Sequence, residues 1–214
     1  NMGYLLVFMM GFLLSGIWFG CHIFVQKWFV KGKMAGIEMF LPLISAFVPT
    51  GIVLATAGKA ALHTGLSGNW MVWGITAGIT VGITCLIKIR LGHIEQNHRP
   101  EYNLFLKCVE AACMEIPQRV MMQTFLCLLL LWKGLPLMMG IILNAGVWGL
   151  SIIVQAVLLK QHDWYEISID VLASIVFSLG SGYVYFTSEI IVIPMIMHAL
   201  ERFIVTKAAE RGGN

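Results

Sequence analysis

Long apolar segments follow one another along almost the whole chain, and short polar links separate them. A membrane-spanning α-helix needs about 20 mainly apolar residues, and seven segments match that length closely enough to be counted as spans. The pattern therefore predicts an all-α fold, a polytopic bundle of about seven transmembrane helices. The predicted spans are Tyr4–Phe29, Ala35–Ala57, Trp70–Ile89, Leu104–Trp132, Leu135–Leu159, Ile167–Phe186 and Ile190–Thr206.

The links between the predicted spans carry an uneven distribution of positive charge. Nine lysines and arginines lie at the first, third and fifth links and at the C-terminus, against two at the second and fourth links. Cytoplasmic loops carry the excess of lysine and arginine, so the N-terminus is expected outside and the C-terminus in the cytoplasm. Because the links are short and no repeat stands out, residues 1–214 are expected to form a single membrane domain.

Composition supports the membrane class and excludes others. The chain is 58% hydrophobic and only 12% charged, whereas soluble domains carry about 25% charged residues. The net charge of +3 is confined to loops, and no basic stripe interleaved with aromatic residues points to a nucleic acid. The lipid bilayer is the predicted environment, and the short loops favour a multi-pass protein of a plasma (inner) membrane.

Small residues recur at four-residue spacing in two of the predicted spans. Gly74, Gly78 and Gly82 lie on one face of the third span, and Gly16 and Gly20 lie on one face of the first. Small residues at this spacing let helix backbones approach closely in a membrane. Both faces are therefore expected to pack against neighbouring helices.

Three ionisable residues fall inside stretches that otherwise consist of apolar side chains. Glu115 and Arg119 are four residues apart in the fourth span, so they share a helix face and can pair, and His198 lies in the seventh span. A charged group at bilayer depth is costly unless it is paired or faces a polar cavity. Pro117 lies between Glu115 and Arg119 and is expected to break the helix there. These residues are functional candidates, with a structural ion pair as the alternative.

Polar side chains also line single faces of three later spans, and this arrangement predicts a polar pocket inside the bundle. The alternative is hydrogen bonding between helices that serves only packing. The fifth span carries Asn144, Trp148, Ser151 and Gln155; the sixth carries Asp170, Ser174, Ser178 and Ser181; the seventh carries His198 and Arg202, with Pro194 one turn earlier.

These residues resemble the motifs of the CPBP family, the CAAX prenyl proteases and bacteriocin-processing or abortive-infection membrane proteins. The resemblance covers about residues 104–205 and depends on Glu115-Ile-Pro-Gln-Arg119 and on Pro194-x-x-x-His198-Ala199. It implies an intramembrane protease that acts on a membrane-associated peptide. In that role Glu115 would activate a water, His198 would hold it, and Asn144 or Arg202 would stabilise the oxyanion.

The chain departs from the family pattern at catalytic positions. Met114 stands where the first glutamate of the EExxxR motif belongs, and Trp148 or a residue near Asn144 replaces the second motif's histidine. Arg202 stands where the last motif has asparagine. The sequence therefore leaves open whether the chain is an enzyme.

Three functions remain open on the sequence: a CPBP-like protease, a catalytically degenerate relative that binds or chaperones a partner membrane protein, and a small-molecule or ion carrier. A protease requires Glu115 and His198 to share a water in an accessible pocket. A degenerate protein is expected to hold Glu115 on Arg119 or Arg202, with Trp148 filling the gap. No cofactor is predicted, and metal dependence is left open because good ligands are too few for a zinc site.

Overall fold

The computed structural model describes residues 2–31, 38–57, 70–92 and 104–212. Within these ranges the chain is helical, without strands. The elements are α1 (Met2–Lys31), the short 3₁₀ helix η1 (Glu38–Phe40), α2 (Leu41–Ala57), α3 (Trp70–Leu91), α4 (Leu104–Glu115), the π-helical segment η3 (Ile116–Gln123), α5 (Thr124–Trp132), α6 (Met139–Leu158), α7 (Trp164–Ser188) and α8 (Val192–Gly212). Three basic residues used to predict orientation, Lys33, Lys59 and Arg99, lie outside the described residues.

Helical structure coincides with the described part of every predicted span, which confirms the all-α class of the fold. Among the described residues, four helices are long and apolar enough to cross a membrane: Met2–Trp28 within α1, and the whole of α3, α6 and α7. The apolar part of α2, Leu41–Thr56, is shorter, and α4 and α8 carry more charged side chains. The apolar helices indicate a membrane protein.

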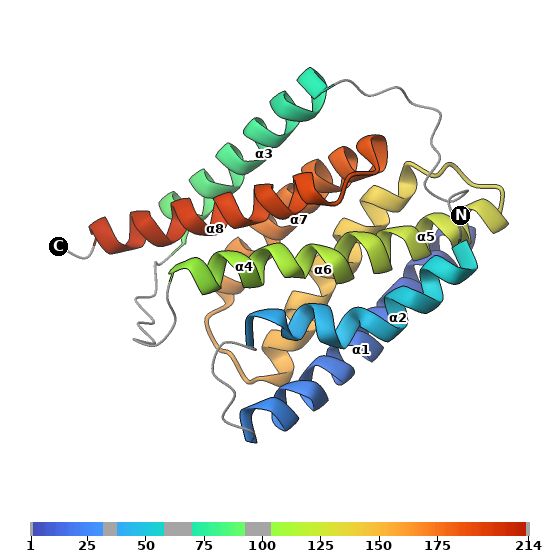
Figure 1. Ribbon diagram of the computed structural model, residues 1–214, viewed down its shortest axis with the longest axis horizontal. Helices are drawn as coiled ribbons and strands as arrows, with labels where there is room; N and C mark the ends of the chain where they lie inside the picture. Colours follow the sequence, from blue (N-terminus) through green and yellow to red (C-terminus); the bar gives the residue numbers. More distant parts are fainter. Residues whose placement is uncertain (1, 32–37, 58–69, 93–103, 213–214) are drawn as a thin grey trace.

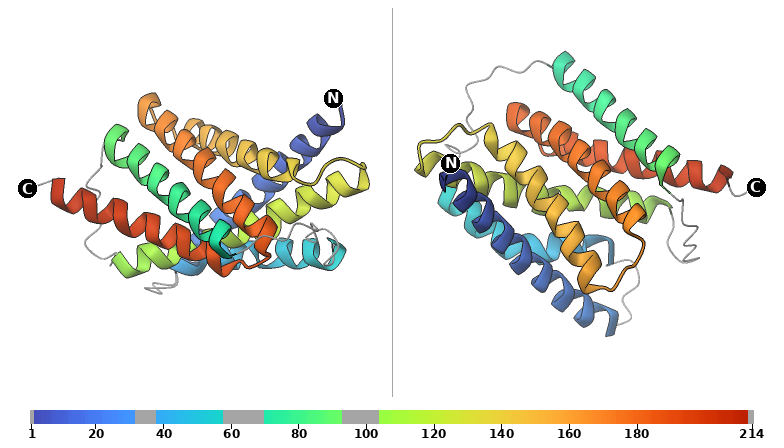
Figure 2. Two further views of the ribbon diagram at one scale, coloured as in Figure 1. Left: turned by 90° about the horizontal axis from the view of Figure 1, so that it is seen from above. Right: turned by 180° about the vertical axis from the view of Figure 1, so that it is seen from behind.

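The helices form two layers that cross each other (Figure 1). One layer contains α2, the long helix made of α4, η3 and α5, and α8; the other contains α1, α6, α7 and α3, as the view from behind in Figure 2 shows. Contacts between elements link the layers at both edges, since α3 packs on both α7 and α8 and α1 packs on both α2 and α6. The π segment η3 lies at the centre, where it contacts α1, α2, α6 and α7.

The fourth predicted span is one continuous helix whose middle is wound as a π-helix. The break expected at Pro117 takes this form, with Pro117 near the start of η3. Proline has no N–H to donate, so the usual hydrogen bond to the preceding turn is lost there. At the other end the N–H of Thr124 donates to the carbonyl of Arg119, five residues back, as π-helical winding requires. The π-helical winding begins directly after Glu115 and contains Arg119, the two charged residues of the motif.

An apolar cluster fills the space between α1, α2, the π segment and α6. Trp18, Met121, Leu126 and Trp148 belong to it and are all buried. Large apolar side chains also remain exposed along the outer faces of the helices, Ile79 of α3 and Phe47 of α2 among them. Such faces suit a bilayer, in which lipid tails can pack against the apolar side chains on the outside of the helices.

The expected packing role of the two glycine stripes is wrong within this molecule. A Cβ added at Gly74, Gly78 or Gly82 would meet no atom of the described residues within 4 Å. The same holds at Gly16 and Gly20. The close approach of α3 to α7 occurs on another face, where a Cβ at Gly180 would collide with Thr80. The four-residue spacing of the glycines identifies a small-residue face of α3, but it does not determine which face of α3 packs against the neighbouring helices.

Candidate functional site

Glu115, Arg119 and His198 meet at the centre of the bundle. Nε of Arg119 donates to Oε2 of Glu115 over 3.0 Å, and Nδ1 of His198 donates to Oε1 of the same carboxylate over 2.7 Å. Glu115 and Arg119 are fully buried, whereas the His198 side chain keeps 14% of its surface exposed. The three residues therefore form a buried charge cluster that ties the α4–η3–α5 helix to α8.

The Arg119 guanidinium extends this cluster to α7. Its Nη2 donates to Oγ of Ser178 over 3.2 Å and, less closely, to Oε1 of Gln118 over 3.4 Å. Its remaining nitrogen Nη1 is buried without a hydrogen-bond partner among the described residues. Because a guanidinium distributes one charge over several donors, Arg119 can join Glu115 to Ser178 in the opposite layer.

Asn144 attaches α6 to the π segment rather than to the Glu115 carboxylate. Its Nδ2 donates to the backbone carbonyl of Gln118 over 3.1 Å and lies 3.5 Å from Oε1 of Gln123. Nε2 of Gln123 in turn donates to the carbonyl of Gly182 over 2.9 Å. Asn144 thus satisfies a carbonyl within the π-helical winding, and its own Oδ1 is buried without a partner in the described part of the chain.

Local sequence explains why this geometry arises in the fourth span. Glu115 is the last residue of α4, and Arg119 lies four residues later inside the π segment. Pro117 between them removes a donor from the helical ladder, and the polar side chains Gln118 and Gln123 lie within the same irregular winding. π-helical segments are rare and frequently occur at functional sites.

Arg202 and Trp148, predicted as supporting residues, lie elsewhere. The ion pairs of Glu115 are with Arg119 and His198, and Arg202 of α8 is half-buried without an ion pair to that carboxylate. The Trp148 ring packs edge-on against Trp18 of α1, with ring centroids 5.4 Å apart. Trp148 is therefore part of the apolar core between α1 and α6.

A second buried ion pair escaped the sequence analysis. Glu201 of α8, one turn beyond His198, is 1% exposed, and Nζ of Lys88 on α3 lies 2.9 Å from its Oε1. Its Oε2 has no hydrogen-bond partner among the residues that the structure describes. The signal was present, because a carboxylate inside a predicted span is costly unless it is paired.

Gln118 and Gln123 were also missed, although they hold the site together. Both are amides in the apolar run that contains Glu115 and Arg119. The Gln123 side chain contacts α6 and α7, whereas Gln118 accepts from Arg119 with its side chain and from Asn144 of α6 with its backbone carbonyl. Polar residues next to a buried charge are reasonable candidates for the hydrogen bonds that the charge needs. That rule would have found them.

The hydrogen bonds that the Glu115 carboxylate already makes limit the reactions that the cluster could catalyse. Both oxygens of Glu115 accept hydrogen bonds from protein groups, so in this arrangement no water is held directly between Glu115 and His198. Of the three clustered residues, His198 is the one whose side chain is partly exposed. Its second ring nitrogen is not used in the bond to Glu115. Among the described residues, no three His, Cys, Asp or Glu side chains gather as metal ligands would.

Comparisons with protein-family models, with curated proteins and with solved structures found no match to this chain.

Proposed function

We propose that this chain is a catalytically degenerate, CPBP-like membrane protein that binds or chaperones a partner membrane protein. The proposal combines the motif resemblance of residues 104–205 with the absence of glutamate at Met114, where the family places it. A hydrolase of this kind would need a carboxylate that is able to activate water. A binding protein needs only the fold that the cluster stabilises.

The observation that carries the proposal is that each oxygen of the Glu115 carboxylate is held by a protein donor. This carboxylate is fully buried, and its oxygens lie 3.0 Å from Arg119 and 2.7 Å from His198. A general base must reach the proton that it abstracts directly or through one water. A carboxylate held by a guanidinium on one side and an imidazole on the other instead serves to neutralise the guanidinium and to join the two groups.

The proposed protein spans a plasma membrane seven times, with its N-terminus outside and its C-terminus in the cytoplasm. The asymmetry of lysine and arginine between alternate links supports this orientation. α8 and the α4–η3–α5 helix count as spans in this proposal because their central charges, Glu115 and Glu201, are paired inside the bundle. Pairing reduces the cost of a charge at bilayer depth.

An intramembrane peptidase is the second candidate, and two observations favour it. The 2.7 Å bond from Nδ1 fixes the His198 ring and leaves its other nitrogen as the one able to exchange a proton. Nη1 of Arg119 is a buried donor and Oδ1 of Asn144, at the π segment, is a buried acceptor, both without partners among the described residues. A peptide group carries one acceptor and one donor, so it could satisfy both.

The experiment that separates the two candidates uses cells that make this chain naturally. Membranes are compared from cells with the wild-type chain, without it, and with His198→Asn. Asparagine can still donate to Glu115 from a position close to Nδ1, but it lacks the second ring nitrogen. Mass spectrometry then measures every new peptide terminus and the abundance of every membrane protein.

If the chain is a binding protein, its deletion is expected to lower the abundance of particular membrane proteins, and no peptide terminus is expected to depend on it. The His198→Asn chain is then expected to restore the lost abundance. A peptide terminus present with the wild-type chain and missing with both deletion and His198→Asn would establish the peptidase instead. Equal amounts of the wild-type and His198→Asn chains in the membrane provide the folding control.

A further inference from the structure

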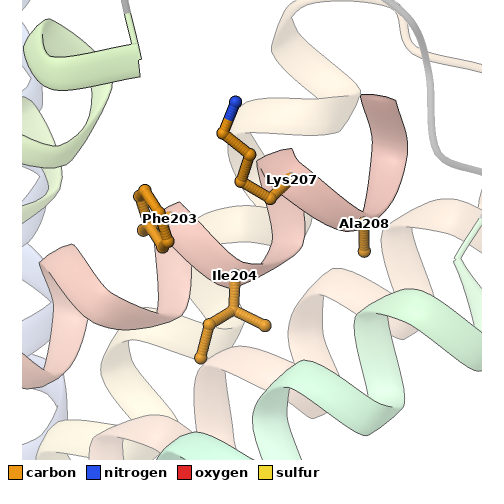
Figure 3. A pocket seen from close by; sticks show the side chains of 4 residues that line it. All are labelled: Phe203, Ile204, Lys207 and Ala208. Atoms are coloured by element: carbon orange, nitrogen blue, oxygen red, sulfur yellow. The ribbon is translucent and has the colours of Figure 1, made fainter. Parts of the chain in front are cut away.

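An open hollow lies along the C-terminal half of α8, apart from the charge cluster (Figure 3). It has a volume of about 700 Å³ and is lined by Phe203, Ile204, Lys207 and Ala208. Figure 3 shows the ring of Phe203 and the Lys207 chain on one side of the helix, with Ile204 and Ala208 on the other. Its volume is within the range of about 300–1,000 Å³ typical of small-molecule sites.

The hollow occupies the part of α8 in which a short apolar run, between Glu201-Arg202 and Lys207, is followed by a charged end. Phe203, Ile204 and Val205 precede Lys207, and Glu210 and Arg211 follow it. The end of α3, the beginning of α4 and the end of α8 lie at the same side of the molecule (Figure 1). Lysines near the ends of membrane helices keep their ammonium group at headgroup level while the alkyl chain lies on apolar surface.

The ammonium of Lys207 is available for exchange with an anion. It pairs with Oε2 of Glu210 over 2.6 Å, and both side chains are more than 40% exposed. Exposed ion pairs contribute little free energy. A phosphate at the same position could therefore replace the Glu210 carboxylate at small cost, whereas the apolar residues of the hollow offer no polar partner for a soluble anion.

We propose that this hollow binds one anionic phospholipid, with an acyl chain against Phe203, Ile204 and Ala208 and the phosphate at Lys207. Among the described lining residues, the apolar side chains and the Lys207 ammonium match the two ends of such a lipid. Basic pockets at the cytoplasmic ends of membrane helices recognise anionic headgroups. The site does not depend on the function proposed for the Glu115 cluster.

The test is native mass spectrometry of the purified full chain in detergent, titrated with dioleoyl phosphatidylglycerol and separately with dioleoyl phosphatidylcholine. The wild-type chain is expected to bind the anionic lipid more tightly. Lys207→Gln is expected to weaken phosphatidylglycerol binding about fivefold, since one lysine near the surface has an effect of this size on anionic lipid. Glu210→Gln is expected to strengthen it, because the competing carboxylate is removed.

A second variant tests the hollow itself. Ala208→Phe would fill the hollow, and it is expected to lower occupancy by both lipids. Matched controls are Lys160→Gln in the link after α6 and Val157→Phe on an exposed face of α6, neither of which is expected to change lipid binding. Equal affinity of the wild-type chain for the two lipids, or unchanged phosphatidylglycerol binding by Lys207→Gln and Ala208→Phe, would overturn the proposal. Unchanged helix content and elution volume show that each variant is folded.

Discussion

At the scale of single residues, the site depends on one carboxylate shared between two partners. Glu115 joins Arg119 of its own helix to His198 of α8, so the loss of its charge leaves a fully buried guanidinium without an anion. Removing one member of a buried ion pair is far more damaging than the net stabilisation by the pair suggests. The integrity of the centre is therefore expected to depend on this residue.

Glu115→Gln is expected to lower the free energy of unfolding by about 3–5 kcal/mol, because Arg119 stays buried and charged. The measurement is unfolding in mixed detergent micelles. Glu210→Gln is the matched control: it removes the carboxylate of an exposed ion pair and is expected to change stability by less than about 1 kcal/mol. Equal effects of the two substitutions would show that the buried pair does not hold the bundle together.

Asn144→Ala tests the amide that satisfies the π segment. Its loss leaves the Gln118 carbonyl without the 3.1 Å hydrogen bond from Nδ2, so stability is expected to fall by about 1–3 kcal/mol. Ser151→Ala is the comparison, since Ser151 donates to Val147 of its own helix and meets Ser15 at 3.0 Å. A smaller loss, about 1 kcal/mol, is expected there. Both are read from the same unfolding experiment.

At the scale of elements, the π segment and α7 pack closely at a glycine. A Cβ at Gly182 would lie 2.9 Å from Oε1 of Gln123 and 3.1 Å from Cγ2 of Ile141. Gln123 also donates to the carbonyl of Gly182, so its side chain cannot withdraw freely. The absence of a side chain at this position lets α7 reach the amides that support the site.

Gly182→Ala is accordingly expected to destabilise the protein by about 1–3 kcal/mol through overpacking. Gly78→Ala on α3 is the matched control, because nothing lies within 4 Å of its added Cβ. There, alanine's better helix propensity is expected to leave stability unchanged or raise it by up to about 1 kcal/mol. Thermal unfolding of both variants in the same detergent gives the comparison. The reverse order would contradict the packing described for α7.

At the scale of the whole molecule, the proposed topology puts successive links on opposite sides of the membrane. Lys133, after α5, is expected outside, and Lys160, after α6, is expected in the cytoplasm; both are exposed. Lys133→Cys and Lys160→Cys are made in a Cys21→Ser background, which removes the exposed native cysteine. An impermeant maleimide applied to intact cells is expected to label position 133 alone.

Position 160 is expected to react only after the cells are permeabilised. Labelling of both positions in intact cells, or of position 160 alone, would contradict the proposed orientation. The Cys21→Ser parent serves as the control for background labelling, since three of its remaining cysteines are buried and Cys108 is half-buried. This result would test the charge asymmetry between alternate links independently of any function.

Several features of the protein follow from the sequence by itself. Continuous apolar segments predict helices and a bilayer, because a backbone in lipid must satisfy its own hydrogen bonds. The cost of a buried charge identified Glu115, Arg119 and His198, which the structure brings together. Of the four residues on the inward face predicted for the fifth span, Asn144, Trp148 and Ser151 are buried, whereas Gln155 is only half-buried.

Tertiary structure decided what spacing cannot determine. Spacing places residues on a face of one helix, but the rotation and depth of each helix decide which other helix that face meets. For this reason Glu201 pairs with Lys88 of α3, Asn144 reaches a carbonyl of the π segment, and Trp148 packs on Trp18. The glycines of α3 face outward for the same reason. The chain thus determines which residues must find partners, and only the packing of the bundle determines which partners they find.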